Sequence, residues 1–189
     1  MITQIATVMI MAAFYAAYFL KMINQRKAGI STVILGKGNK PQGVKVVEVR
    51  ITIISIMVVL VELMSIYWNL MELPSWCQWI GVGVAALGVV VFCMAIHTMQ
   101  NNWRAGIPET RETSLVTKGI YRYSRNPAFV GFDLLYLGIL IAFPNAWHAC
   151  VVAAAAYIFH LQIINEEKYL ADTFGEEYIE YKNSVRRYL

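Results

Sequence analysis

The sequence predicts an all-α, polytopic membrane helical bundle of about five spans, whose last two spans form a helical hairpin followed by an amphipathic C-terminal helical tail. Three observations lead to this fold class. Hydrophobic residues make up 58% of the 189 residues and charged residues only 15%. The mean hydropathy is +0.52, above that of an ordinary soluble domain. The apolar residues are gathered in five runs that polar segments separate.

Each of the five apolar runs approaches the length that a helix needs to cross a bilayer, about 20 residues. The runs cover residues 2–20, 51–67, 79–99, 127–143 and 146–164. Pro144 and Asn145 form a tight turn between the last two, so spans four and five are predicted to pack directly as a hairpin. The tail mixes charged and aromatic residues around Gly175, which predicts an amphipathic helix, or a helix pair broken at that glycine.

The distribution of charge predicts how the bundle is oriented. If the polar, basic loop over residues 21–45 is cytoplasmic, five spans bring residues 100–125 and the tail to the same side. All sixteen Lys and Arg then fall at the cytoplasmic face, as the positive-inside rule requires. The N-terminus is then outside and the C-terminus cytoplasmic. Four tryptophans mark the opposite ends of the spans, where indole rings form an interfacial belt: Trp68, Trp76, Trp79 and Trp147.

Composition also argues against several functions. The excess of basic over acidic residues, 16 against 12, forms no patch interleaved with aromatic residues, so no nucleic-acid partner is expected. The three cysteines form no CxxC pair and have no histidine at a metal-ligand spacing, so no metal site is expected. No obligatory protein partner is evident.

Residues 1–99 are expected to form a three-span membrane region and residues 100–189 a cofactor-binding region, within one integrated domain.

A polar segment rich in Gly, Tyr, Arg, Asn and Pro precedes the fourth run and reads TSLVTKGIYRYSRNPAF. Asn126 is a good N-cap and Pro127 a good first helical residue, so this pair starts the span whatever the protein does. The start of a helix at the cytoplasmic face also suits an anion, because its free amides and positive dipole end stabilise a carboxylate or phosphate.

A pair of carboxylates, Glu166 and Glu167, follows the fifth run. Carboxylates at the end of a span are often simply solvated. The turn between spans four and five, however, should return this end of the chain to Asn126. The sequence therefore predicts that two polar clusters, far apart along the chain, meet at one depth.

The segments LVTKGIYRYSRNPAFVGF, EEKYL and FGEEYIEYKNSV occur in this order around the predicted hairpin. On these residues the chain resembles the isoprenylcysteine carboxyl methyltransferase and phospholipid methyltransferase superfamily, over roughly residues 100–185. The resemblance implies a membrane enzyme that binds S-adenosylmethionine at the cytoplasmic face and receives a lipophilic small molecule or lipid from the bilayer. The segment WRAGI is similar to bacterial members, which implies a bacterial inner membrane.

The resemblance also implies site residues. Carried over by position, the cofactor contacts fall on Gln100, Thr113, Ser114, Leu115, Val116, Tyr121, Asn126, Pro127, Phe129 and Glu166. A carboxylate can bind the cofactor's amino or ribose hydroxyl groups, helix-start amides its carboxylate, and aromatic rings its adenine and sulfonium. Methyl transfer from a sulfonium is an in-line displacement, so the protein mainly positions donor and acceptor in a dry site.

Two positions depart from the isoprenylcysteine enzymes. Asn126 replaces the His of an Arg-His-Pro turn, which keeps the helix cap but removes a titratable group. Gln162 replaces an Arg suited to the acceptor's carboxylate, and glutamine cannot form that charge-assisted fork. The acceptor is therefore not expected to be a prenylcysteine carboxylate. Gln162 and Trp103 remain candidate substrate contacts, and Arg125 a candidate catalytic residue.

Asp133 is a second candidate catalytic residue. It follows Asn126 by seven residues, which puts it on the same helical face and about 10 Å deeper. An ionisable group at that depth suggests a function by default. Asp133 could hold a cationic acceptor or take its proton, which would favour an amine such as an aminophospholipid.

Two other ionisable residues are given structural roles. Glu62 is predicted to snorkel or pack near the outer end of span two, and His160 is predicted to be a satisfied core histidine.

Two other functions remain open. The sterol reductases share a similar hairpin and a related Arg-His-Pro region, so an NADPH-dependent membrane reductase is possible. In that case Lys118, Arg122 and Arg125 would bind the 2′-phosphate. A non-catalytic transport or assembly protein is the other alternative, although the sequence has no visible repeats or paired discontinuous helices.

Overall fold

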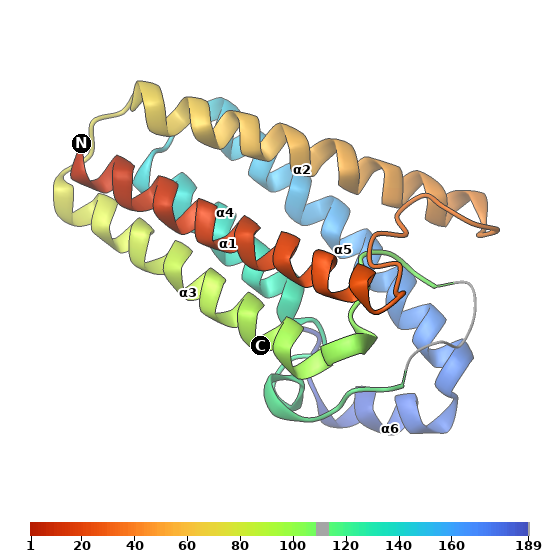
Figure 1. The fold of residues 1–189 in the computed structure, drawn as a ribbon. Helices are drawn as coiled ribbons and strands as arrows, with labels where there is room; N and C mark the ends of the chain where they lie inside the picture. The colour runs from red at the N-terminus through yellow and green to blue at the C-terminus, as the bar shows by residue number, and fades with distance from the viewer. Residues whose placement is uncertain (109–113, 189) are drawn as a thin grey trace.

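Five long helices run along one bundle axis, and a short sixth helix lies across one end of the bundle (Figure 1). The computed structural model describes residues 1–108 and 114–188. Its α-helices are α1 (Ile2–Lys27), α2 (Gln42–Trp68), α3 (Ser75–Met99), α4 (Pro127–Ala142), α5 (Ala146–Phe174) and α6 (Glu176–Ser184). Two short 3-10 helices, η1 (Gln100–Asn102) and η2 (Gly119–Arg122), lie between α3 and α4.

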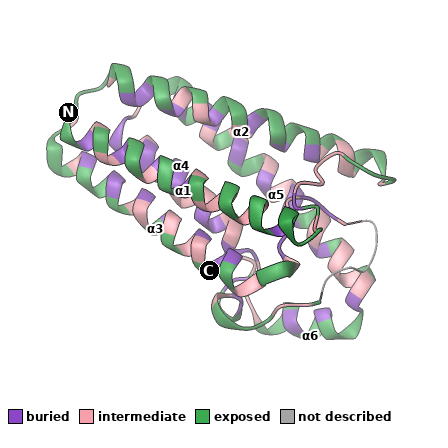
Figure 2. Cartoon of the chain, in the orientation of Figure 1, coloured by how far each residue is buried: buried purple, intermediate pink, exposed green. Residues whose placement is uncertain are grey.

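The all-α membrane bundle expected from the sequence is confirmed. Helices α1, α2, α3 and α5 are long and apolar enough to cross a membrane. Many large apolar residues of these helices are exposed, as expected for helices that face lipid. Figure 2 shows exposed positions along α1, α2 and α3. Helix α4 is apolar but has only 16 residues, so it measures about 24 Å, less than a hydrocarbon core of ~30 Å. A fifth crossing of the membrane would have to be made by α4, which is shorter than the four candidate spans.

Several helices extend further than the apolar runs do. The predicted loop over residues 21–45 is too long, because α1 continues to Lys27 and α2 begins at Gln42. Helix α5 likewise continues past its apolar run to Phe174. The predicted break at Gly175 is confirmed, and this residue has a φ of +56°, a left-handed conformation that favours glycine.

The packing of the hairpin differs from the expectation. The turn returns the chain to the same end of the bundle, but α4 packs most extensively against α3, and α5 against α2. Direct packing of span five on span four is therefore wrong as the main contact. The cause is four glycines: Gly81 and Gly88 of α3 face Gly138 and Gly131 of α4, which lets the two backbones touch. Because these contacts join the two regions of the chain, we propose that they form one folding unit.

The loops at the polar end of the bundle are held together by a buried ion pair that the sequence did not suggest. Glu48 of α2 is fully buried, and its carboxylate lies 2.8 Å from Lys40 Nζ. It also accepts hydrogen bonds from the backbone amides of Gly36 and Ile107. An isolated β-bridge between Val33 and Ala105 joins the same two loops. This network fixes the loops on which the site below depends.

Candidate active site

A cavity of about 640 Å³, here called the chamber, lies among α1, α2, α4 and α5. Most of its lining is apolar or aromatic, including Tyr18, Ile51, Phe129, Phe132 and Phe159. Three further lining side chains, Phe19, Ile56 and Leu60, are also at least half exposed on the outer surface. The chamber is therefore open to the surroundings between α1 and α2.

One end of the chamber is polar. Asn126 at the start of α4 and Glu166 of α5 both border it, so the two clusters that are distant in sequence lie at the same end of the bundle. Gln162 Nε2 donates a hydrogen bond of 2.9 Å to Glu166 Oε1. The other amide atom, Gln162 Oε1, is buried with no hydrogen-bonding partner among the described residues. This end of the chamber therefore offers an acceptor oxygen that the protein itself does not use.

A smaller cavity of about 70 Å³, here called the side pocket, shares Tyr121, Asn126 and Leu170 with the chamber. Tyr178 and Tyr181 of α6 complete its wall, and Tyr181 donates a hydrogen bond of 2.7 Å to the Tyr121 carbonyl. Burial raises the pKa of Tyr178 to about 12 and also raises the pKa values of Tyr121 and Tyr181. These phenols therefore stay neutral at physiological pH.

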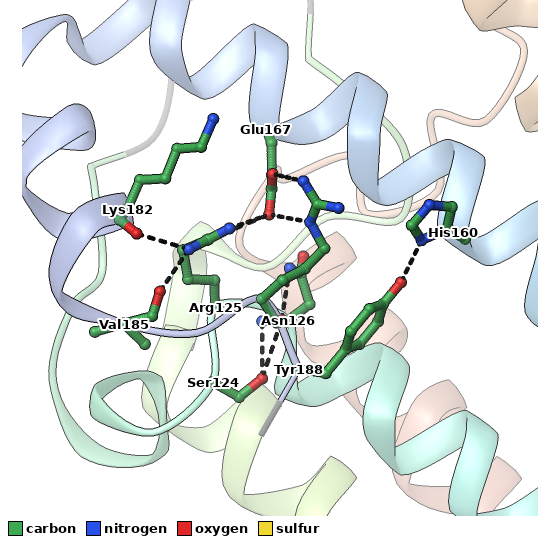
Figure 3. Close-up of polar contacts among 9 residues, drawn as sticks. Ser124, Arg125, Asn126, His160, Glu167, Lys182, Val185 and Tyr188 are labelled. Carbon is green, nitrogen blue, oxygen red and sulfur yellow. Dashed lines mark hydrogen bonds and ion pairs between the residues drawn. The ribbon is translucent and has the colours of Figure 1, made fainter.

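The C-terminal segment is tied across the polar end by a cluster here called the clamp, formed by Arg125, Glu167 and Arg187 (Figure 3). The Glu167 carboxylate lies 2.9 Å from Nη2 of each arginine. Arg125 Nη1 also donates to the carbonyl oxygens of Lys182 and Val185. The Arg125 guanidinium thus holds the tail, and Arg125 also borders both the chamber and the side pocket, so its catalytic role stays a prediction.

Most of the other expected site residues lie around the two cavities. Those that line the chamber are Trp103, Tyr121, Asn126, Phe129, Gln162 and Glu166. Those that line the side pocket are Ser114, Leu115, Val116, Tyr121 and Asn126. Pro127 is buried as the first residue of α4. Gln100 is exposed and lines neither cavity, and Thr113 lies outside the described residues.

Two acidic residues lie away from both cavities. Asp133 lines neither cavity and interacts electrostatically with Tyr188, so it faces the C-terminal segment rather than an acceptor in the chamber. Tyr188 in turn bonds the ring of His160, with an oxygen-to-nitrogen distance of 2.6 Å (Figure 3). Glu62 is fully buried, which agrees with packing, one of the two alternatives expected for it, and not with snorkelling.

Sequence reasoning missed several residues around the site. Tyr178, Tyr181 and Leu170 line the side pocket, although the tail's aromatic residues at helical spacing could have indicated such a wall. Arg104 and Gly106 border the polar end of the chamber. Lys118 and Arg122, which a reductase would need, are exposed and line neither cavity.

Comparisons with known proteins bear on this arrangement. The family model described as "Isoprenylcysteine carboxyl methyltransferase (ICMT) family" matches residues 79–172. Protein-S-isoprenylcysteine O-methyltransferase of Saccharomyces cerevisiae is 31% identical over 112 residues, which cover 58% of this chain and 47% of the yeast protein. The Dictyostelium discoideum protein of the same name is 32% identical over 110 residues, 57% of this chain and 46% of that protein. The chain thus spans about half the length of the curated relatives it matches.

A solved structure has the same fold. The eukaryotic intramembrane Ras methyltransferase ICMT superposes with a TM-score of 0.63 at 22% identity, covering 93% of this chain and 62% of that one. The bundle and the chamber define an integral membrane protein with a cavity that opens among apolar helices. The chain belongs to the isoprenylcysteine carboxyl methyltransferase superfamily.

Proposed function

We propose that the protein transfers a methyl group from S-adenosylmethionine to an acceptor held in the membrane. The observation that carries this proposal is that the start of α4 and Glu166 border one cavity, which continues between apolar helices and is open between α1 and α2. A polar donor and a lipophilic acceptor could therefore meet without leaving the protein. Membership of a superfamily whose relatives are named as methyltransferases supports the same reaction.

The residues at the polar end fit the cofactor. Glu166 and the unpartnered Gln162 Oε1 would accept hydrogen bonds from its amino or hydroxyl groups. The first amides of α4 would bind its carboxylate, and Tyr121, which lines both cavities, would contact its rings. When bound, S-adenosylmethionine supplies a methyl group already activated by a sulfonium. Tyr18, Phe129 and Phe132 keep water away from the reacting atoms.

Stabilisation by a ligand tests the cofactor. We expect S-adenosylhomocysteine at a hundredfold excess over its Kd to stabilise the detergent-purified protein by about 2.7 kcal/mol, and NADPH to have no effect. Glu166→Gln should weaken binding of S-adenosylhomocysteine about tenfold, because the amide offers one acceptor oxygen where the carboxyl group offers two. Glu72→Gln, an exposed change beyond α2, is the matched control and should bind normally. A rise in unfolding temperature with NADPH alone would instead favour a reductase.

We further propose that the acceptor does not present a prenylcysteine carboxylate. Gln162 offers no positive charge, and the clamp occupies the Arg125 guanidinium. Arg104, which also borders this end, donates to the backbone carbonyls of Asn101 and Trp103. A carboxylate at this end would then lack the charge-assisted fork that a free arginine provides. We expect N-acetyl-S-farnesylcysteine to be methylated at least tenfold more slowly than a phosphatidylethanolamine, in nanodiscs with labelled cofactor. Equal or faster methylation of the farnesylcysteine would contradict this proposal.

We also propose that the polar end faces the cytoplasm, with the N-terminus outside. The loop before α2, the segment between α3 and α4, and the tail carry the basic residues, and all three lie at this end (Figure 1). The similarity of the segment WRAGI to bacterial proteins favours the bacterial inner membrane. A cytoplasmic cofactor could then reach the side pocket directly.

A further inference from the structure

A groove of about 530 Å³ lies between α1 and α3 near the polar end of the bundle. The two helices run side by side (Figure 1) and touch on either side of the groove. Toward the middle of the bundle, the rings of Phe14 and Phe92 stack with centroids 4.4 Å apart. Toward the polar end, Gln25 Nε2 donates to the carbonyl oxygens of Gln100 and Trp103. These contacts fix the spacing of the helices, so the groove is a preformed feature of the fold.

The lining of the groove changes from apolar to polar along its length. The inner part is lined by small or apolar residues, which include Ala17, Leu20, Cys93 and Met94. The part nearer the loops is lined by side chains with hydrogen-bond donors, namely Lys21, Asn24 and His97. The groove shares no lining residue with the chamber or the side pocket. A molecule that fits it therefore has an apolar part toward the middle of the membrane and a polar part near the membrane surface.

The groove provides positive charge and no negative charge. Neither α1 nor α3 contains an aspartate or a glutamate. Lys21 is half-buried, and within the part of the chain that the structure describes it takes part in no ion pair. Lys27 follows Asn24 by three residues, so it extends the positive charge along the same face of α1. A half-buried cation without a carboxylate partner favours an anionic ligand.

We propose that the groove binds an anionic phospholipid, with its phosphate beside Lys21 and the start of one acyl chain against Ala17 and Cys93. Lys21 supplies the charge, and Asn24 and His97 donate hydrogen bonds to the head group. Basic pockets between membrane helices are typical sites for such head groups. The bound lipid joins α1 to α3 from outside the bundle. Because the groove is separate from the chamber, this inference does not depend on the proposed function.

Lipid binding measured by native mass spectrometry tests the inference. The delipidated protein in detergent is titrated with phosphatidylglycerol or with phosphatidylcholine that has the same acyl chains. We expect phosphatidylglycerol to bind about fivefold more tightly, the effect of one cation near an anionic head group. Lys21→Met should remove this preference, and Lys21→Arg should keep it. Lys45→Met is the matched control, because it removes the same charge from α2 and Lys45 borders neither the groove nor the chamber.

Three results would overturn the inference. Equal affinity for the two lipids would mean that the groove holds unselected membrane lipid. A preference that Lys45→Met lowers as much as Lys21→Met would mean that the overall charge of this end, and not the groove, attracts the lipid. Displacement of phosphatidylglycerol by sn-glycerol 3-phosphate would make the groove a site for soluble anions. If Lys21→Met does not fold, Ala17→Leu fills the apolar part of the groove and should weaken binding of phosphatidylglycerol, and unchanged binding would then contradict the inference.

Discussion

Replacing Gly138 with alanine is expected to destabilise the bundle by about 3 kcal/mol, the upper end of the usual cost of overpacking. A Cβ at this position would collide with the backbone nitrogen of Ala85 and lie 2.7 Å from the Gly81 carbonyl oxygen. Backbone atoms cannot rotate away as a side chain can, so α4 would have to separate from α3. Thermal unfolding in detergent, followed by tryptophan fluorescence, measures the loss.

Gly83 provides the matched control for this substitution. It lies on α3 only two residues from Gly81, but it is exposed and a Cβ there would meet no atom within 4 Å. Gly83→Ala should therefore be neutral, or stabilising by up to about 1 kcal/mol from helix propensity. Similar unfolding temperatures for the Gly138 and Gly83 variants would mean that the close approach of α3 and α4 does not support the fold.

The helices of the bundle could be predicted because they follow from local features of the chain. Apolar runs define the spans, the Pro144 turn returns the chain, and Gly175 breaks the last helix. Which helices pack together was not predicted correctly, since a short turn does not determine the main contact of α4. The sequence did contain the relevant signal: Gly81 and Gly88, like Gly131 and Gly138, are seven residues apart and therefore share a helical face.

The positions around the cavities were predictable to the extent that they belong to the start of α4 or the end of α5. Asn126 and Glu166 border the chamber, whereas their binding of a cofactor stays a prediction. The catalytic roles of Arg125 and Asp133 stay predictions, and the sequence does not show that the C-terminal segment docks beside both residues. Glu62 packs inside the bundle, one of the two alternatives expected for it, but its tyrosine neighbours on α1 and α4 could not be read from the sequence.

Substitution of Glu167 by glutamine is expected to cost about 3 kcal/mol and to release residues 185–188 from the bundle. The Glu167 carboxylate is the common partner of Arg125 and Arg187, and removing one member of a buried ion pair leaves its partners uncompensated. We place the cost at the low end of the range for buried pairs because Arg187 is 35% exposed and water partly screens it. Hydrogen exchange of the tail amides and thermal unfolding measure the two effects.

The clamp also connects stability to the site, because α6 supplies Tyr178 and Tyr181 to the side pocket. Release of the tail in Glu167→Gln should therefore weaken binding of S-adenosylhomocysteine as well, even though Glu167 itself lines neither cavity. Glu180→Gln, an exposed change on α6, removes a charge without touching the clamp and should alter neither property. If the tail amides remain protected in Glu167→Gln, the hydrogen bonds from Arg125 to the Lys182 and Val185 carbonyls are enough to hold the segment, and the carboxylate is not what closes the pocket.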